Sequence, residues 1–227
     1  MTKLIVILIF CLLSSLSYDK PVGCLKMDII VVGDYSSSIN HYEKFVYDAF
    51  ASFVNNFETS EEGIRIGLIK FNDHARLVSP LTHDKKKLNE ALKEFNTNSY
   101  GGTNMEEALQ LALNEFTTNG KPENMKMLIM VSDGMPQNQD SVLLVASQLK
   151  DLLHIGICSV LVVKSKEPPP ADQMIPMPAA PWGIPTTNYY NDNSVDAEFM
   201  QKLSSKCYVE SDYENLAKEL KKLDICM

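Results

Sequence analysis

Residues 27–38 have the sequence Met27-Asp28-Ile29-Ile30-Val31-Val32-Gly33-Asp34-Tyr35-Ser36-Ser37-Ser38, and this stretch decides how the fold is interpreted. Its first half is a nearly continuous apolar run, which is typical of a strand buried on both faces of a parallel sheet. The run ends in Asp34-x-Ser36-x-Ser38, at the end of a strand where open parallel sheets bind ligands. Because all three side chains offer oxygen, the pattern favours a hard divalent cation.

Composition and charge limit the possible functions. The chain has 227 residues, 45% hydrophobic and 22% charged, which is ordinary for one globular domain with a substantial core. Its formal net charge is −8, from 21 basic and 29 acidic residues. The sequence contains no basic stripe, so we expect no nucleic-acid partner.

Apolar periodicity predicts that strands alternate with helices along the chain. Strands are expected at residues 27–33, 64–71, 75–78, 125–131, 154–163 and 207–209, and helices at 41–57, 84–95, 104–116, 140–153, 196–205 and 212–223. This alternation indicates an α/β fold that is three-layered, Rossmann-like and doubly wound. We expect a mostly parallel six-stranded sheet with one antiparallel edge strand, from a hairpin, and helices on both faces.

Two further segments carry oxygen ligands. Gly101-Gly102-Thr103 precedes the helix predicted at 104–116, and Asp133-Gly134 follows the strand predicted at 125–131. In a parallel sheet these segments converge with residues 34–38 on one edge. Five oxygens from short side chains, completed by water, suit Mg²⁺, and Mn²⁺ also fits. The candidate metal ligands are Asp34, Ser36, Ser38, Thr103 and Asp133.

With these segments in place, the chain resembles the von Willebrand factor type A domain with its metal-ion-dependent adhesion site, over residues 24–226. The matching segments, in the family's order and spacing, are Asp34–Ser38, Phe71–Ala75, Gly101–Leu109 and Val131–Gly134. The resemblance implies that Ser36, Ser38 and Thr103 bind the metal through their hydroxyls. It also implies that Asp34 and Asp133 bind directly or through water.

One residue departs from the family pattern, which usually has glycine where this chain has Ser37. A side chain there could crowd the loop or shift its backbone. Since all the ligand residues are retained, we expect metal binding to survive with altered affinity. The alternative is a vestigial, metal-free site.

The resemblance implies a protein-binding or adhesion module whose metal has an open position for an Asp or Glu of a protein partner. The alternative function is a metal-independent structural or assembly scaffold with the same fold. An enzyme is not expected, because none of the four histidines lies in a nucleophile motif and no Gly-x-Ser-x-Gly sequence occurs.

The first residues have the features of a signal peptide. Lys3 is followed by the apolar run Leu4–Leu13 and by small residues up to Ser17, so we expect residues 1–17 to be removed on export. The run is too short to span a bilayer comfortably. The mature chain is therefore expected to be secreted or extracytoplasmic, without a transmembrane segment.

Four cysteines remain after the leader, and an even number in an exported chain favours disulfides. Four cysteines allow three pairings. Cys24 and Cys226 lie near the two ends of the domain, which are often close in space, so this is the pair that we favour. Cys158 and Cys207 then form the second pair. The alternative is that Cys158, within an apolar strand, is a buried free thiol.

Residues 164–195 interrupt the alternation with a long proline-rich insertion, which also contains the only tryptophan. A long irregular segment within a compact domain is usually functional or disordered. Because it follows a parallel strand, we expect it on the same rim as Asp34 and Asp133. Trp182, Tyr189 and Tyr190 are therefore candidate partner-binding residues.

Overall fold

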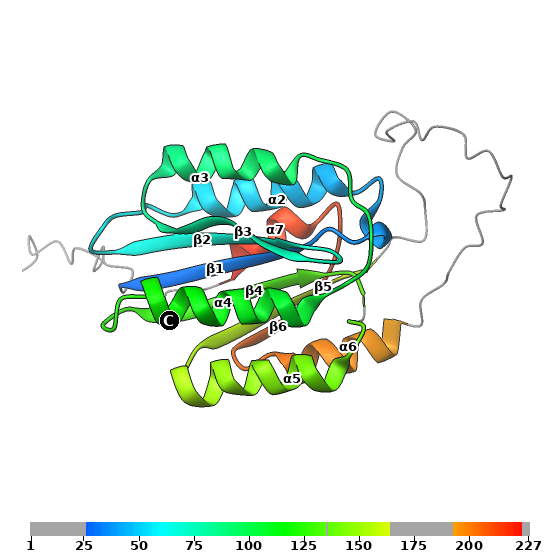
Figure 1. Cartoon of the computed structure of the whole chain (residues 1–227). Helices are drawn as coiled ribbons and strands as arrows, with labels where there is room; N and C mark the ends of the chain where they lie inside the picture. The colour runs from blue at the N-terminus through cyan, green and yellow to red at the C-terminus, as the bar shows by residue number, and fades with distance from the viewer. Residues whose placement is uncertain (1–25, 135, 164–192, 224–227) are drawn as a thin grey trace, which may run out of the picture.

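The computed structural model describes residues 26–134, 136–163 and 193–223. Its sheet has six strands in the order β3-β2-β1-β4-β5-β6, and only β3 runs antiparallel, against β2 (Figure 1). The strands are β1 (Met27–Asp34), β2 (Ile64–Phe71), β3 (Ala75–Thr82), β4 (Met125–Ser132), β5 (Gly156–Val163) and β6 (Cys207–Asp212). The expected fold class is confirmed.

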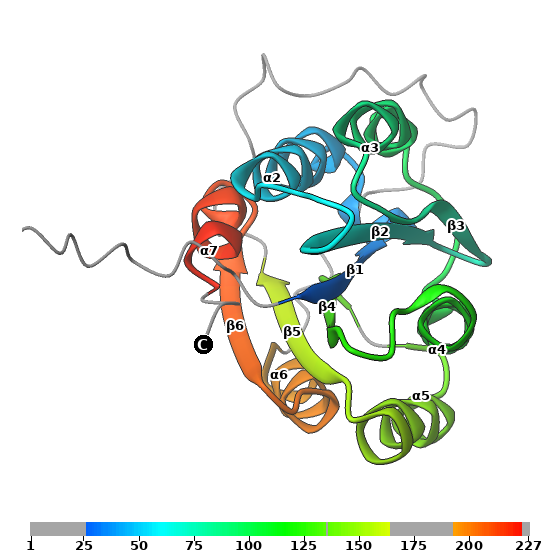
Figure 2. The same ribbon diagram turned by 90° about the vertical axis from the view of Figure 1, so that its left-hand side faces the viewer.

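Helices cover both faces of the sheet. They are α2 (Glu43–Asn56), α3 (Lys85–Leu92), α4 (Met105–Asn119), α5 (Gln139–Ser147), α6 (Asn193–Leu203) and α7 (Leu216–Lys222). Helices α2, α3 and α7 lie on one face, and α4, α5 and α6 lie on the other (Figures 1 and 2). Among the helices in the described ranges, none is long and apolar enough to cross a membrane.

Strand β1 is central, and all eight of its residues are buried. Its side chains alternate between two apolar cores. Ile29 and Val31 pack in the core under α2, α3 and α7, whereas Ile30 and Val32 pack in the core under α4, α5 and α6. Each such side chain stabilises the fold by about 1.5–3 kcal/mol, which explains why residues 29–32 are apolar on both faces of the strand.

The close approach of α2 to β1 depends on Gly33. A Cβ atom at this position would lie 2.5 Å from Cε2 of Phe50 on α2, closer than two carbon atoms can pack. The glycine therefore lets α2 pack tightly beside the carboxyl end of β1. This is the end at which the candidate ligands lie.

Asp28 is a charged residue within the apolar run, and it is fully buried. It lies opposite Arg65 in the β1–β2 register, and its carboxylate accepts hydrogen bonds from Nε at 2.9 Å and Nη2 at 2.8 Å. Asn124 Nδ2 and the Lys121 backbone N–H also donate to it, each at 2.8 Å. The buried charge is thus compensated at the end of β1 opposite the candidate site.

Several element boundaries differ from those predicted. The hairpin strand β3 continues to Thr82 instead of residue 78. One of its two register shifts spans Pro80, which cannot donate a ladder hydrogen bond. Strand β6 extends to Asp212, so the last helix begins at Leu216 instead of residue 212. Helix α6 begins at Asn193, within the range assigned to the insertion.

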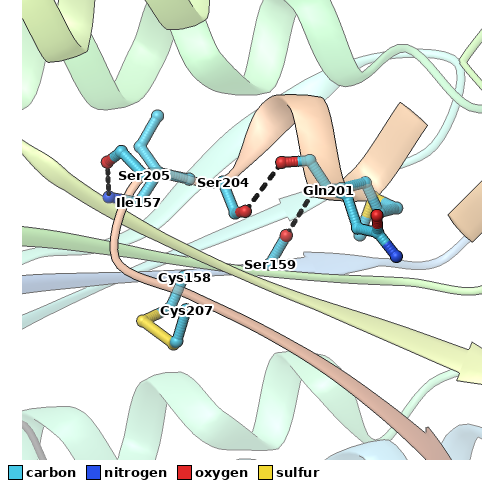
Figure 3. Close-up of a disulfide and its surroundings, with 8 residues drawn as sticks. Ile157, Cys158, Ser159, Gln201, Ser204, Ser205 and Cys207 are labelled. Atoms are coloured by element: carbon cyan, nitrogen blue, oxygen red, sulfur yellow. Dashed lines mark hydrogen bonds between the residues drawn. A yellow bond between two sulfur atoms is a disulfide. The ribbon is translucent and has the colours of Figure 1, made fainter. Parts of the chain in front are cut away.

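A disulfide joins Cys158 of β5 to Cys207 of β6, with an S–S distance of 1.99 Å (Figure 3). The two residues are direct partners in the parallel register, with Cα atoms 4.5 Å apart. Cys158 is therefore bonded and is not the free thiol considered as an alternative. Cys24 and Cys226 lie outside the described residues, as do the signal peptide and Trp182, Tyr189 and Tyr190, so those predictions remain untested.

Candidate metal site

The candidate site lies at the carboxyl ends of two neighbouring strands. Asp34 is the last residue of β1, and Asp133 directly follows the last residue of β4. A short 3-10 helix, η1 (Ser37–Ile39), begins three residues after Asp34 and turns the chain back over the strand ends. The fold thereby brings residues that are about a hundred positions apart in sequence into one cluster.

Hydrogen bonds connect four of the five candidate ligands. The Ser36 N–H donates to Asp34 Oδ1 at 2.8 Å, and the hydroxyls of Ser36 and Ser38 lie 2.8 Å apart. Ser38 Oγ donates to Asp133 Oδ1 at 2.6 Å. Asp34, Ser36 and Asp133 are less than a tenth exposed. The cluster is therefore compact and held by its own hydrogen bonds, and the polar atoms of its side chains are all oxygens.

Thr103, the fifth candidate, lies on the loop that leads into α4. This loop is held against the cluster because the Ser37 N–H donates to the Gly101 carbonyl at 3.0 Å. Asp73 fixes the loop from the other side, since its Oδ1 accepts from the Gly102 N–H at 2.7 Å. Gly101 has a φ of +78°, and a Cβ there would lie 2.2 Å from Asp73 Oδ2, so the position requires glycine.

Asp73 belongs to the segment Phe71–Ala75. This segment matches the family pattern, but the resemblance alone implies no role for it. In the structure it acts as a loop anchor. Its side chain accepts from the Gly102 N–H, and its backbone carbonyl accepts from Asn104 Nδ2 at 3.1 Å. Asn104 also caps α4 by accepting from the Glu107 N–H. Phe71–Ala75 thus supports the Thr103 loop and supplies none of the proposed ligands.

Ser37, the departure from the family pattern, fits the loop without strain. Its side chain is exposed, and its backbone φ is not in the left-handed region that favours glycine. Its N–H makes the hydrogen bond to Gly101, which any non-proline residue can make. The serine therefore fits this loop conformation without backbone strain.

The electrostatics favour a cation. Burial and, secondly, the charge of Asp133 raise the pKa of Asp34 from 3.8 to about 7, although hydrogen bonds from Ser132 and Ser36 act in the opposite direction. Two carboxylates so close together repel each other, and a divalent cation would relieve that repulsion.

Within the described ranges no three His, Cys, Asp or Glu residues converge, and the donor set here is instead two carboxylates with serine and threonine hydroxyls. Such hard oxygen donors fit Mg²⁺ or Mn²⁺.

Two further residues of the site are not among the candidate ligands that the sequence predicts. Ser132 Oγ donates to Asp34 Oδ2, and the Tyr213 hydroxyl donates to Asp133 Oδ2 at 2.7 Å. Tyr213 follows β6 and was placed by periodicity in the last helix without a role. Only the register of β4, β5 and β6 brings it next to Asp133.

Two surface features adjoin the cluster. Tyr100, next to Gly101, is 66% exposed, which is unusual for a large aromatic side chain. A cavity of about 60 Å³ lies beside Thr103, between the first turns of α4 and α5, and Gln137 and Ser141 contribute to its lining. The face around the cluster thus offers both an aromatic contact and a small polar recess.

Comparison with known sequences agrees with this arrangement. The sequence profile of the von Willebrand factor type A domain matches residues 28–222. The chain therefore belongs to the von Willebrand factor type A domain family.

Among characterised proteins, the chain is similar to integrin alpha-2 of Bos taurus, with 26% identity over 183 residues. The match covers 78% of this chain and 16% of the integrin, so the chain spans less than a fifth of that relative. The activity of the whole integrin is therefore not assigned to this chain.

Two solved structures share the fold. Proximal thread matrix protein 1 from the mussel byssus, in a structure with a zinc-occupied MIDAS motif, has a TM-score of 0.63 and 18% identity, covering 90% of this chain and 47% of that chain. Manganese-loaded TRAP protein of Plasmodium vivax has a TM-score of 0.57 and 18% identity, covering 88% of this chain and 75% of that chain. At these identities the likeness establishes the common fold.

Proposed function

We propose that this chain is a secreted protein-binding module that holds Mg²⁺, or Mn²⁺, and through it binds an Asp or Glu of a protein partner. The ligands would be Asp34, Ser36, Ser38, Thr103 and Asp133. The observation that carries the proposal is the hydrogen-bonded set of two buried carboxylates and the hydroxyls of Ser36, which is buried, and Ser38, which is partly buried, at adjacent strand ends.

The donor set explains why a partner acid would be needed. Serine and threonine hydroxyls are neutral ligands, and the five proposed protein ligands would leave one of the six positions of an octahedral Mg²⁺ open. The carboxylates of Asp34 and Asp133 each also accept a hydrogen bond from a hydroxyl, which draws electron density away from them. A bound cation supplies a Lewis acid with an incompletely filled shell, and a partner carboxylate is the group that suits it.

The overall charge of the chain supports a metal-dependent contact. An acidic partner segment would be repelled by a protein with a net charge of −8. A cation between the two surfaces reverses that repulsion at the point of contact. The metal-loaded relatives support the same inference, because their shared fold holds manganese in one case and zinc at a MIDAS motif in the other.

Export and the partner surface remain part of the proposal. The features of residues 1–17 support secretion, and the Cys158–Cys207 disulfide fits an oxidising compartment. Tyr100 would contribute to the partner surface, together with Trp182, Tyr189 and Tyr190 of the insertion. We propose binding and not catalysis, since none of the site residues that the structure describes forms an activated nucleophile paired with a general base.

One observation favours the alternative, a metal-independent scaffold. Hydrogen bonds link Ser36 through Ser38 to Asp133, which also accepts from Tyr213, and such a network could order the loops by itself. In that case the carboxylates would serve only to order the loops.

Calorimetry with MgCl₂ separates the two functions. Wild-type protein should bind Mg²⁺, whereas Asp34→Ala and Thr103→Ala should not. Ser38→Ala and Ser37→Ala form a matched pair, because both remove a serine hydroxyl but only Ser38 belongs to the proposed ligand set; Ser37→Ala should bind like wild type.

Capture of peptides bearing Asp or Glu should be lost in EDTA. Equal Mg²⁺ binding by wild type and Asp34→Ala would refute the metal site, and capture unaffected by EDTA would support the scaffold.

A further inference from the structure

Tyr213 reaches the candidate site from the far edge of the sheet. It directly follows β6 and precedes α7, and its side chain is 2% exposed. Its hydroxyl donates to Asp133 Oδ2 at 2.7 Å in a buried hydrogen bond. A buried phenol needs such a partner, and here the partner is a proposed metal ligand.

The contact completes the restraint of Asp133. One carboxylate oxygen, Oδ1, accepts from Ser38 Oγ at 2.6 Å, and the other accepts from Tyr213. These donors come from η1 and from the turn after β6, so they approach from different sides of the group. With both oxygens held, the carboxylate plane cannot rotate freely about its terminal bond.

The tyrosine ring is itself fixed. It stacks on Tyr42, the residue before α2, with ring centroids 4.1 Å apart and an interplanar angle of 13°. The position of the phenol oxygen is therefore set by packing as well as by its hydrogen bond. A donor held in this way can determine the orientation of its acceptor.

The chemistry of the donor also suits a cation site. A lysine or arginine could hold Asp133 equally well, but its positive charge would oppose a metal ion. Tyr213 and Ser132 are both neutral hydroxyl donors, and each binds the Oδ2 atom of one of the two carboxylates. The two carboxylates are thus oriented in equivalent ways, without any competing charge.

We propose that Tyr213 is a positioning residue that orients Asp133 for metal binding, a role that rests on the proposed function of the site. Hydrogen bonds to metal ligands fix the direction of the ligand atoms, and their removal typically lowers metal affinity 10–100-fold. The C-terminal part of the domain then contributes to the metal site without supplying a ligand.

The test is Tyr213→Phe, which keeps the ring and its stacking on Tyr42 but removes the hydroxyl. Titration calorimetry with MgCl₂ and MnCl₂ should show an affinity roughly 10–100-fold weaker than that of wild type. Thermal melting in EDTA should show a shift smaller than about 5 °C, because the packing is retained. Tyr208→Phe on β6 is the matched control, since its hydroxyl donates to Glu210 at the surface, and its metal affinity should be unchanged.

The outcomes distinguish this inference from the proposed function. If wild type binds Mg²⁺ and Tyr213→Phe binds equally well, the positioning role is wrong and the metal site stands. If wild type binds neither metal, both proposals are wrong. If Tyr213→Phe loses affinity together with a large fall in the melting temperature in EDTA, Tyr213 is a structural residue and the inference is overturned.

Discussion

Replacing Asp34 with asparagine should stabilise the metal-free protein while abolishing its response to metal. The carboxyl of Asp34 is buried beside Asp133, and its pKa is raised from 3.8 to about 7. Above that pH the folded chain must therefore carry a charge that its surroundings disfavour. Asparagine has nearly the same shape without this charge.

The magnitude follows from the change in pKa. Each pKa unit corresponds to about 1.4 kcal/mol, so moving a carboxyl from 3.8 to about 7 lowers the stability at pH 8 by roughly 4 kcal/mol. Asparagine has one acceptor oxygen instead of two, and rearranging the hydrogen bond from Ser132 or Ser36 costs about 1–2 kcal/mol. The net gain is about 2–3 kcal/mol. For a domain of this size that raises the melting temperature by about 5–10 °C.

The raised pKa of Asp34 also fixes the direction in which stability changes with pH. Between pH 4 and pH 7 the unfolded chain has released the Asp34 proton, whereas the folded chain retains it. Folding therefore takes up a proton in this range, and the contribution of Asp34 to stability falls as the pH rises through it. Below pH 4 both states are protonated, so the advantage of asparagine should disappear.

Thermal melting in EDTA between pH 4 and pH 8, followed by titration with MgCl₂ at pH 8, measures both effects. Wild type should be stabilised by Mg²⁺ and Asp34→Asn should not. The exposed residue Asp151 provides the control, and Asp151→Asn should leave the pH profile and the metal response unchanged. If Asp34→Asn is less stable than wild type in EDTA at pH 8, the argument from repulsion fails.

Three further variants test the stability of the fold. Asp28→Ala should destabilise by about 3–5 kcal/mol in denaturant unfolding, because it leaves the Arg65 guanidinium buried without its carboxylate. Gly33→Ala should cost about 1–3 kcal/mol, because the new methyl group meets the Phe50 ring. Replacing both cysteines of the β5–β6 disulfide with alanine should cost about 2–4 kcal/mol by the same assay, given their separation of 49 residues.

Each of these has an outcome that contradicts it. An Asp28→Ala variant as stable as wild type would mean that water replaces the carboxylate at Arg65. A Gly33→Ala variant with the same free energy of unfolding as wild type would mean that the Phe50 ring can move aside at no cost. Equal stability with and without the disulfide would mean that the cross-link adds nothing to the β5–β6 pairing.

The main parts of the site could be predicted because they depend on strand ends. Asp34 and Asp133 follow apolar runs, and parallel strands deliver such residues to one edge whatever the details of packing. Thr103 could be placed only as part of a polar loop before a helix. What holds that loop, the side chain of Asp73, is a contact between loops that no periodicity encodes.

The remaining features depend on register and orientation. Asp28 is a single polar residue in an apolar run, and its partner Arg65 is known only once β1 and β2 are aligned residue by residue. Tyr213 lies in a turn whose position depends on where β6 ends, and β6 is longer than its apolar pattern predicts. The effect of Ser37 likewise required the backbone angle at that position, which the sequence does not specify.

Strand β1 carries a buried carboxylate at each end, and the two differ in how their charge is balanced. Asp28 and Asp34 lie about 20 Å apart along the strand, at about 3.3 Å per residue. Asp28 has a permanent counter-charge, the guanidinium of Arg65, which the chain itself supplies. Under the proposed function the counter-charge of Asp34 would be a bound divalent cation, which can exchange with the solvent. Under that function the lasting counter-charge would compensate Asp28 whether or not a cation is bound, and the exchangeable one would make the opposite end responsive to divalent ions. The domain could then release a partner on chelation and bind it again afterwards, without ever unfolding.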